Sequence, residues 1–252
     1  MEVQASEIIE AMESMHNEEQ RQILMRFFKC GKGQYGEGDQ FLGLKVPQTR
    51  GVVKAAKGTV GFPEIERLIY CKWHEVRLCG FLLLVEEMQK AVPHGRNEGN
   101  AARRKELAEL YLSHARQANN WDLVDLSAPY ILGEFLLHPL PDGTMPSRSL
   151  LDRLAKSNNL WEQRIAIVST LQLIRNHQYT DTLRIAEKLL CHPHDLIHKA
   201  TGWMLREVGK RDMDTLEDFL EAHWTDMPRT TLRYAIERMP EDQRLYWLKR
   251  TK

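Results

Sequence analysis

The chain has 252 residues, of which 42% are hydrophobic and 28% are charged, and its formal net charge at pH 7 is zero. This composition is typical of a soluble globular protein with a sizeable core, in one large domain or two small ones. The neutral balance excludes recognition of nucleic acid through overall positive charge, although basic residues slightly outnumber acidic ones from Met145 onward.

Helical periodicity runs along nearly the whole chain, and no segment shows the sustained alternation of a β-strand. Turn-forming residues interrupt it in the glycine-rich segment 31–43 and at 93–99, 138–143 and 192–195. We therefore predict an all-α protein. In chain order, the expected helices span residues 5–15, 18–29, 47–57, 62–71, 75–91, 100–117, 121–137, 147–157, 160–175, 180–190, 195–209, 213–222, 228–238 and 241–250.

A weak internal repeat relates four of these helices. Segments 75–81, 123–129, 162–168 and 197–203 share a pattern of two residues, a charged residue, and then small and apolar residues. The charged positions lie 48, 39 and 35 residues apart, as in HEAT-like helix pairs, and are in turn Arg77, Asp125, Arg164 and Lys199. We therefore predict a single HEAT-like α-solenoid domain over residues 1–252, with the last three side chains side by side on one surface. Chance similarity among helices is the alternative.

Two other motifs have simpler interpretations. The segment 31–36 reads G-x-G-x-x-G, but a dinucleotide site needs a strand before this motif and a helix directly after it. Here a predicted helix precedes it, and a flexible loop continues to Pro47. His194 and His198 are four residues apart and can share a helix face to hold a metal, but a third ligand at the right spacing is unclear. We favour Asp195 as a helix cap and expect no metal and no cofactor.

Cysteine usage and the N-terminal sequence favour a cytoplasmic protein. The four cysteines are scattered without a CxxC pair, as expected for free thiols in a reducing compartment. The first ten residues are acidic and lack the apolar run of a signal peptide. The apolar run 81–85 is far too short to span a membrane.

The segment NNWDLVDLSAPY, residues 119–130, has the features of a ligand-binding helix. Asn120 is a suitable N-cap, and Trp121 and Asp125 are one turn apart on one face, at the edge of the apolar stripe. Pro129 has no N–H to donate to the carbonyl of Asp125, so we expect a kink or a widened turn there. An ordinary capped helix, with the tryptophan in the core and the aspartate on the surface, is the alternative.

Cations and a second tryptophan accompany this helix in the repeat pattern. They are Arg164, Lys199, Trp203, Arg206 and Lys210. Two tryptophans, one carboxylate and several cations on one surface are typical of a protein that binds a phosphate backbone around a reactive centre.

Three motifs resemble the AlkD family of DNA alkylation repair glycosylases. WDxVD is present at 121–125, WxQRxAI at 161–167 and KAxGWxLRE at 199–207, in the order that the family has them. The segment 42–50 also resembles the family's loop with a Gly-x-x-x-Pro pattern.

The resemblance implies a HEAT-like solenoid that holds duplex DNA on a concave face and removes N3- and N7-alkylated purines without flipping the base into a pocket. By position, Asp125 is the catalytic carboxylate, and Trp121 and Trp203 contact the deoxyribose and backbone at the lesion. Arg164 is the backbone-binding cation between them. Four further residues are candidates for binding DNA: Lys199, Arg206, Lys210 and Lys45. We expect the protein to be a monomer.

The chain departs from the family pattern at two places. Gln172 stands where a lysine is expected two turns after Arg164, which weakens one phosphate contact. Lys45 and Val46 stand where another member of the family has a Gln-Thr pair, which leaves the DNA contacts of this loop open.

The chemistry of these residues fits hydrolysis of a glycosidic bond. An N3- or N7-alkylated purine is cationic and leaves readily, and a fixed carboxylate near C1′ stabilises the positive charge that develops on the sugar. The sequence shows no cluster predicted to form a pocket for a flipped base, and no second acid to protonate a neutral one. We therefore expect a monofunctional glycosylase. A non-catalytic repeat protein that binds DNA is one alternative, and a HEAT-like protein-interaction scaffold, which the weak net basicity favours, is another.

Overall fold

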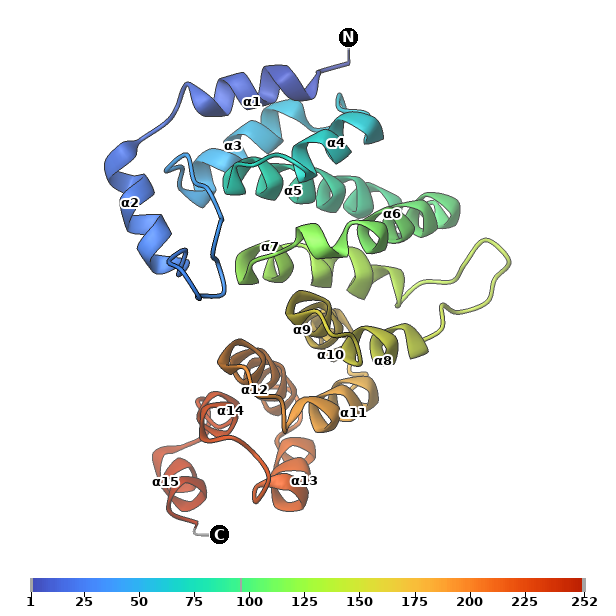
Figure 1. Ribbon diagram of the computed structural model, residues 1–252. Coiled ribbons are helices and arrows are strands. Elements are labelled where there is room, and N and C mark those ends of the chain that lie inside the picture. The colour runs from blue at the N-terminus through green and yellow to red at the C-terminus, as the bar shows by residue number, and fades with distance from the viewer. Residues whose placement is uncertain (1, 96, 251–252) are drawn as a thin grey trace. The chain divides into compact units, whose positions relative to one another are not determined.

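The computed structural model describes residues 2–95 and 97–250, and their regular structure is helical (Figure 1). A 3₁₀ helix, Ala115–Gln117, follows α6, and a π-helical turn, Pro129–Gly133, follows α7. In the described residues, no helix combines the length and the apolar character needed to cross a lipid bilayer. The α-helices are α1 (Ala5–Glu13), α2 (Glu18–Phe27), α3 (Val46–Ala56), α4 (Phe62–Ile69), α5 (His74–Ala91), α6 (Ala101–Ser113), α7 (Trp121–Asp125), α8 (Ser149–Ala155), α9 (Leu160–Val168), α10 (Thr170–Arg175), α11 (Thr180–Leu189), α12 (Asp195–Gly209), α13 (Met213–His223), α14 (Arg229–Ala235) and α15 (Glu241–Lys249).

Each helix expected from the periodicity has a counterpart, which confirms the all-α prediction. Two expected helices are divided. Residues 160–175 form α9 and α10, separated only by Ser169, whose backbone angles are still helical. Residues 121–137 begin as the short helix α7 and continue through the π-helical turn.

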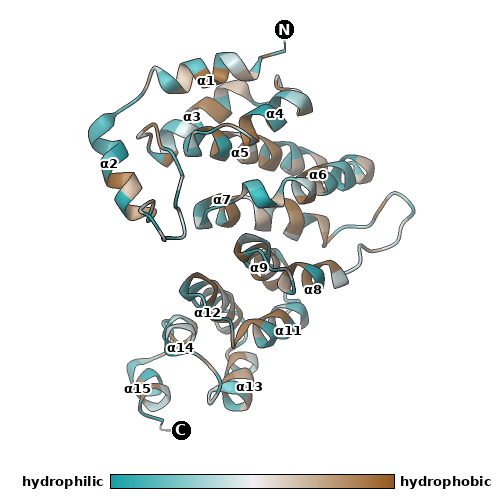
Figure 2. Ribbon diagram, in the orientation of Figure 1, coloured by the Kyte–Doolittle hydropathy of each residue, from teal (hydrophilic) through white to brown (hydrophobic). Residues whose placement is uncertain are grey.

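Contacts divide the chain into two compact units, unit 1 (Met1–Ile131) and unit 2 (Leu132–Lys252). Helix α5 is the centre of unit 1, because α3, α4 and α6 all pack against it and every residue from His74 to Val85 is buried. Figure 2 shows hydrophobic residues along much of this helix. Helix α2, in contrast, has no buried residue.

Unit 2 is built around α12, which packs against α9, α11, α13 and α14. Gly202 allows the close approach of α14, since a Cβ at this position would lie 2.5 Å from the carbonyl oxygen of Thr231. Helices α9 and α12 carry two of the four repeat segments, and α5 and α7 in unit 1 carry the other two. Both pairs pack directly, as successive repeats do. A single solenoid domain with a concave face stays a prediction.

Helix α7 is short because Pro129 interrupts it. The side chain of Asn120 caps its start and accepts a hydrogen bond from the N–H of Trp121 at 2.9 Å. The helix ends at Asp125, and Pro129–Gly133 form a π-helical turn. The predicted widened turn is therefore confirmed, and its cause is the missing N–H of the proline ring. Such π-bulges occur frequently at functional sites.

Candidate functional site

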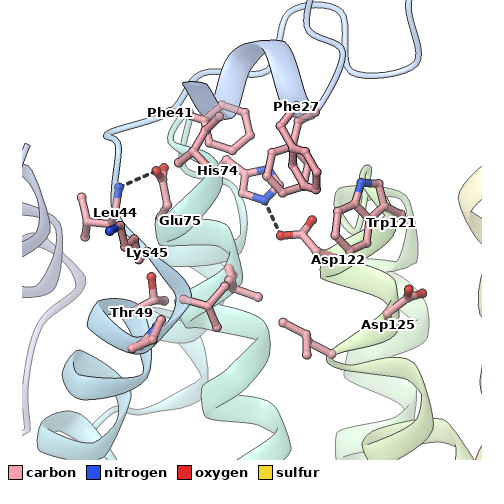
Figure 3. Close-up of a pocket in the computed structure, with 16 residues that line it drawn as sticks. Phe27, Phe41, Leu44, Lys45, Thr49, His74, Glu75, Trp121, Asp122 and Asp125 are labelled. Atoms are coloured by element: carbon pink, nitrogen blue, oxygen red, sulfur yellow. Dashed lines mark hydrogen bonds and ion pairs between the residues drawn. The ribbon is translucent and has the colours of Figure 1, made fainter. Parts of the chain in front are cut away.

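Helix α7 presents Trp121 and Asp125 to a pocket within unit 1 (Figure 3). Both side chains are half-buried, and both line a cavity of about 490 Å³. The other walls come from α2, the loop before α3, α3 itself and α5. The volume lies within the usual range of ligand-binding pockets in proteins.

Aromatic rings form one side of this pocket. Trp121 stacks on Phe28 with centroids 5.2 Å apart, Phe28 on Phe41 at 5.0 Å, and Phe41 on the imidazole of His74 at 4.4 Å. Phe27, which is 59% exposed, makes an edge-to-face contact with Trp121, with ring centroids 5.9 Å apart. No local pattern in the sequence predicts this stack of rings. These rings come from segments far apart in the sequence and converge only in the fold.

One buried carboxylate holds the loop that leads into α3. Glu75 accepts hydrogen bonds at 2.8 to 3.0 Å from the backbone N–H groups of Leu42, Gly43 and Leu44. Gly43 has a φ of +89°, and a Cβ there would lie 2.1 Å from a backbone oxygen, so only glycine fits. This anchoring places Lys45, an exposed residue, at the pocket.

His74, the last ring of this stack, also belongs to a buried cluster of four ionisable side chains. His74 contacts Asp39 through Nδ1 at 2.7 Å and Asp122 through Nε2 at 2.9 Å. Arg77 contacts the second oxygen of Asp39 at 2.5 Å. All four side chains are at most 7% exposed. Two carboxylates thus face one guanidinium and one imidazole, and the charges balance when His74 is protonated.

The pKa values of this cluster follow from burial and pairing. Burial alone lowers the pKa of His74, but the charge and hydrogen bond of Asp122, and then those of Asp39, outweigh it and raise that pKa to about 9. Burial raises the pKa of Asp39, but the contacts with His74 and then Arg77 lower it to about 2. The cluster therefore holds His74 as an imidazolium at neutral pH.

We expect the stability of unit 1 to fall as the pH rises through about 9. The pKa of His74 is raised in the folded state, so its contribution is complete below the ordinary value of 6.5 and is lost as the folded protein loses this proton at about 9. Thermal unfolding followed by circular dichroism between pH 7 and pH 10 measures the loss. The variant His74→Gln should lack this step, and an identical pH dependence in both proteins would contradict the assignment.

In unit 2, the predicted site residue Arg164 and the departure from the family pattern at Gln172 are both buried. Arg164 is 5% exposed and donates a hydrogen bond from Nη1 to the carbonyl of Leu196 at 2.5 Å, which joins α9 to the start of α12. Gln172, at the position expected to be lysine, is 8% exposed and contacts Glu134 through Nε2.

The remaining candidates lie along one face of α12 and directly after it. Lys199, Trp203, Arg206 and Lys210 are spaced by four, three and four residues, which places them on one helical stripe. Trp203 is half-buried. Each of the three cations has an acidic partner; the ion pairs are Lys199–Asp195 at 2.7 Å, Lys210–Glu207 at 2.6 Å, and Arg206–Glu237.

Histidines at the N-terminal end of α12 make hydrogen bonds that stabilise the start of this helix. His194, rather than the expected Asp195, is the N-cap, since its Nδ1 accepts a hydrogen bond from the N–H of Leu196 at 3.1 Å. His198 contacts the carbonyl of His192 through Nε2 at 2.5 Å. Within residues 2–95 and 97–250, no group of three or more His, Cys, Asp or Glu side chains is arranged to hold a metal ion.

The chain matches a known protein family over most of its length. A family model described as "DNA alkylation repair enzyme" matches residues 8–239. The chain belongs to the DNA alkylation repair enzyme family. The resemblance inferred from the three motifs is thereby confirmed.

A solved structure shares the fold of this DNA alkylation repair family member. It is described as a predicted DNA alkylation repair enzyme from Enterococcus faecalis, with a TM-score of 0.66 and 16% sequence identity over 90% of this chain and 97% of that chain. At this identity the likeness shows the fold alone. No curated protein sequence matches the chain.

Several residues of the pocket and of the buried cluster in this DNA alkylation repair family member were not predicted from the sequence. The pocket residues His74 and Glu75, and Asp39 of the cluster, belong to none of the three motifs. Phe28 falls near the end of a helix with an ordinary composition. The one residue in the motifs that could have indicated this cluster is Asp122, which is part of WDxVD but had no role assigned to it. Its buried contact with His74 supplies one.

Proposed function

We propose that this chain is a monofunctional DNA glycosylase that hydrolyses the N-glycosidic bond of cationic N3- and N7-alkylated purines in duplex DNA, the first step of base excision repair. The observation that carries the proposal is the half-buried carboxylate of Asp125, one turn after Trp121 at a pocket, in a DNA alkylation repair enzyme family member. Trp203 is proposed to act with Trp121 on the sugar and backbone of the lesion.

The chemistry requires little more than these groups. The alkylated base leaves with the electron pair of the glycosidic bond and becomes neutral, while positive charge develops at C1′ of the sugar. Asp125 stabilises that charge and orients the water whose oxygen adds to C1′, and the proton that this water loses passes to the carboxylate and then to solvent. A tryptophan face contributes about 0.5–2 kcal/mol of cation–π attraction to the cationic sugar. The products are the free base and an abasic site.

The pocket supports recognition without base flipping. The rings of Trp121 and Phe28 are stacked on each other, and Phe41 is stacked on His74, so these faces are already covered. The polar lining groups of Glu75 and His74 are engaged with the loop N–H groups and with carboxylates. Neither is placed to protonate a departing base, and the proposed substrate is therefore one whose own charge weakens the bond.

We propose that the α12 stripe, with Arg164 and Lys45, binds the phosphates, and we expect affinity for undamaged duplex to fall steeply with salt. The expected slope of log K against log salt is about −0.9 for each phosphate neutralised. The variant Lys199→Gln should reduce the slope by about one such contact. Lys188→Gln, on α11 and paired with Asp152, is the matched control and should leave it unchanged. Fluorescence anisotropy from low to moderate salt measures both, and a flat dependence would favour the scaffold alternative.

The direct test is incubation with duplex DNA that contains one N7-methylguanine, followed by detection of the released base. Release supports the glycosylase. Tight binding to the same duplex without release would instead favour a non-catalytic protein that recognises damaged DNA.

A further inference from the structure

His74 connects three parts of unit 1 through side chains alone. Its two ring nitrogens reach Asp39 in the loop before α3 and Asp122 in α7, while His74 itself is the first residue of α5. Asn120, the N-cap of α7, also donates to Asp39, at 3.3 Å. Both the cap and the first turn of α7 are therefore tied to this cluster.

These contacts with Asp122 and Asn120 determine the position of α7, because so short a helix is not stable without tertiary contacts. A helix of five residues has little stability alone, so tertiary contacts decide where it lies. Trp121 precedes Asp122 by one residue, and Asp125 follows it by three. The ring stack provides a second connection to His74, from Trp121 through Phe28 and Phe41.

Both contacts of His74 require the protonated ring. A neutral imidazole carries one N–H, so it donates to one carboxylate and turns a lone pair toward the other. In a buried cluster an unpaired carboxylate is costly. Loss of the proton therefore weakens the tie either to the loop or to α7.

We propose that His74 is a positioning residue for the glycosylase reaction, and that the protonated ring, held between Asp39 and Asp122, keeps α7 where the Asp125 carboxylate meets the reacting sugar. This role rests on the function proposed above. His74 touches neither sugar nor base, and its effect passes through Asp122 to the helix that carries Asp125.

Loss of the proton near pH 9 should then slow base release. Three charged groups pair within the cluster: Asp39 from the loop, Arg77 from α5 and Asp122 from α7. Other ionisable groups lie nearby. Glu75, next to His74 in the sequence, accepts hydrogen bonds from the loop N–H groups of Leu42 and Gly43. The Cys30 thiol is near Asp39, and burial, with the charge of Asp39, raises its pKa to about 11, above the expected transition. The pocket also places Lys45 and Asp125 in its lining.

The test is single-turnover release of N7-methylguanine from a duplex, with enzyme in excess, from pH 6.5 to pH 10 and with spontaneous release subtracted. We expect the wild-type rate to fall as the pH rises through about 9. His74→Gln should be at least tenfold slower at pH 7.5, with a pH profile that lacks this fall and with DNA affinity within twofold of wild type. His114→Gln is the matched control, because His114 is also buried between two partners, Glu66 at 2.8 Å and Tyr70 at 3.1 Å, and it should match wild type.

A measurement on the unmodified protein keeps the inference testable should the His74 variant unfold. Imidazole nitrogen NMR of histidine-labelled protein should show both His74 nitrogens protonated at pH 7.5. A neutral ring there, or a wild-type rate that stays flat through pH 9, would overturn the positioning role. If the wild type releases base and His74→Gln releases it equally fast, only the positioning role fails. Absence of release by the wild type would overturn the proposed function itself, and the positioning role with it.

Discussion

Asp125→Asn should abolish base release while leaving affinity for duplex DNA within about twofold. The amide has nearly the shape of the carboxylate but no charge, so it neither stabilises the cationic sugar nor accepts the proton lost by the attacking water. Removal of one group that stabilises transition-state charge typically slows an enzyme about 10²–10³-fold, and we expect at least 100-fold here. Binding is retained because the proposed phosphate contacts lie mainly in unit 2.

Single-turnover rates on N7-methylguanine duplex, with dissociation constants from anisotropy, measure the two effects separately. Asp142→Asn, in the turn between Leu140 and Thr144, carries the same change of charge at a residue that does not line the pocket and should behave as wild type. Full activity of Asp125→Asn would remove Asp125 from the mechanism. An equal loss of rate and affinity would show that the carboxylate acts in binding.

Substrate charge should decide which lesions are released. Cationic N3-methyladenine and N7-methylguanine need no protonation to leave, whereas neutral hypoxanthine and 1,N6-ethenoadenine do. A general acid typically contributes 10²–10⁴-fold, and the pocket groups of Glu75 and His74 are already engaged. Neutral lesions should therefore be released at least about 100-fold more slowly.

Matched duplexes that differ only in the lesion allow this comparison in one assay. The size of the alkyl group should matter less than the charge of the base, since the base is proposed to stay out of a closed pocket. Hypoxanthine released at a rate comparable to N7-methylguanine would show that a general acid exists among the residues to which we assign a structural role.

Local patterns in the sequence predict the helices and the distortion of α7 well. Helical periodicity and turn residues act within a few positions of one another, so the element order follows from them. The π-helical turn at Pro129 follows from the single missing N–H of that residue. The predicted cap of α12 lies one residue too late, because a histidine nitrogen takes the role usually filled by an acid.

The buried cluster and the aromatic pocket could not be predicted from the sequence, because they form from residues that are far apart in the chain. Asp39, His74 and Asp122 are separated by 35 and 48 residues, and no spacing rule joins them. The aromatic pocket depends likewise on the loop that Glu75 anchors. The ion pair of Arg206 with Glu237 likewise joins residues 31 apart, whereas Lys199–Asp195 and Lys210–Glu207 follow the local helix spacing. The proposed phosphate contacts of these cations compete with their ion pairs.

Hydrolysis of the glycosidic bond of a cationic purine is the activity that we propose for this chain. The most direct measurement quantifies free N7-methylguanine and abasic sites from one duplex after a single turnover with the wild-type protein. We predict equal amounts of the two products, with the damaged strand intact until alkali is added. Binding with no free base, or strand cleavage without alkali, would contradict the account.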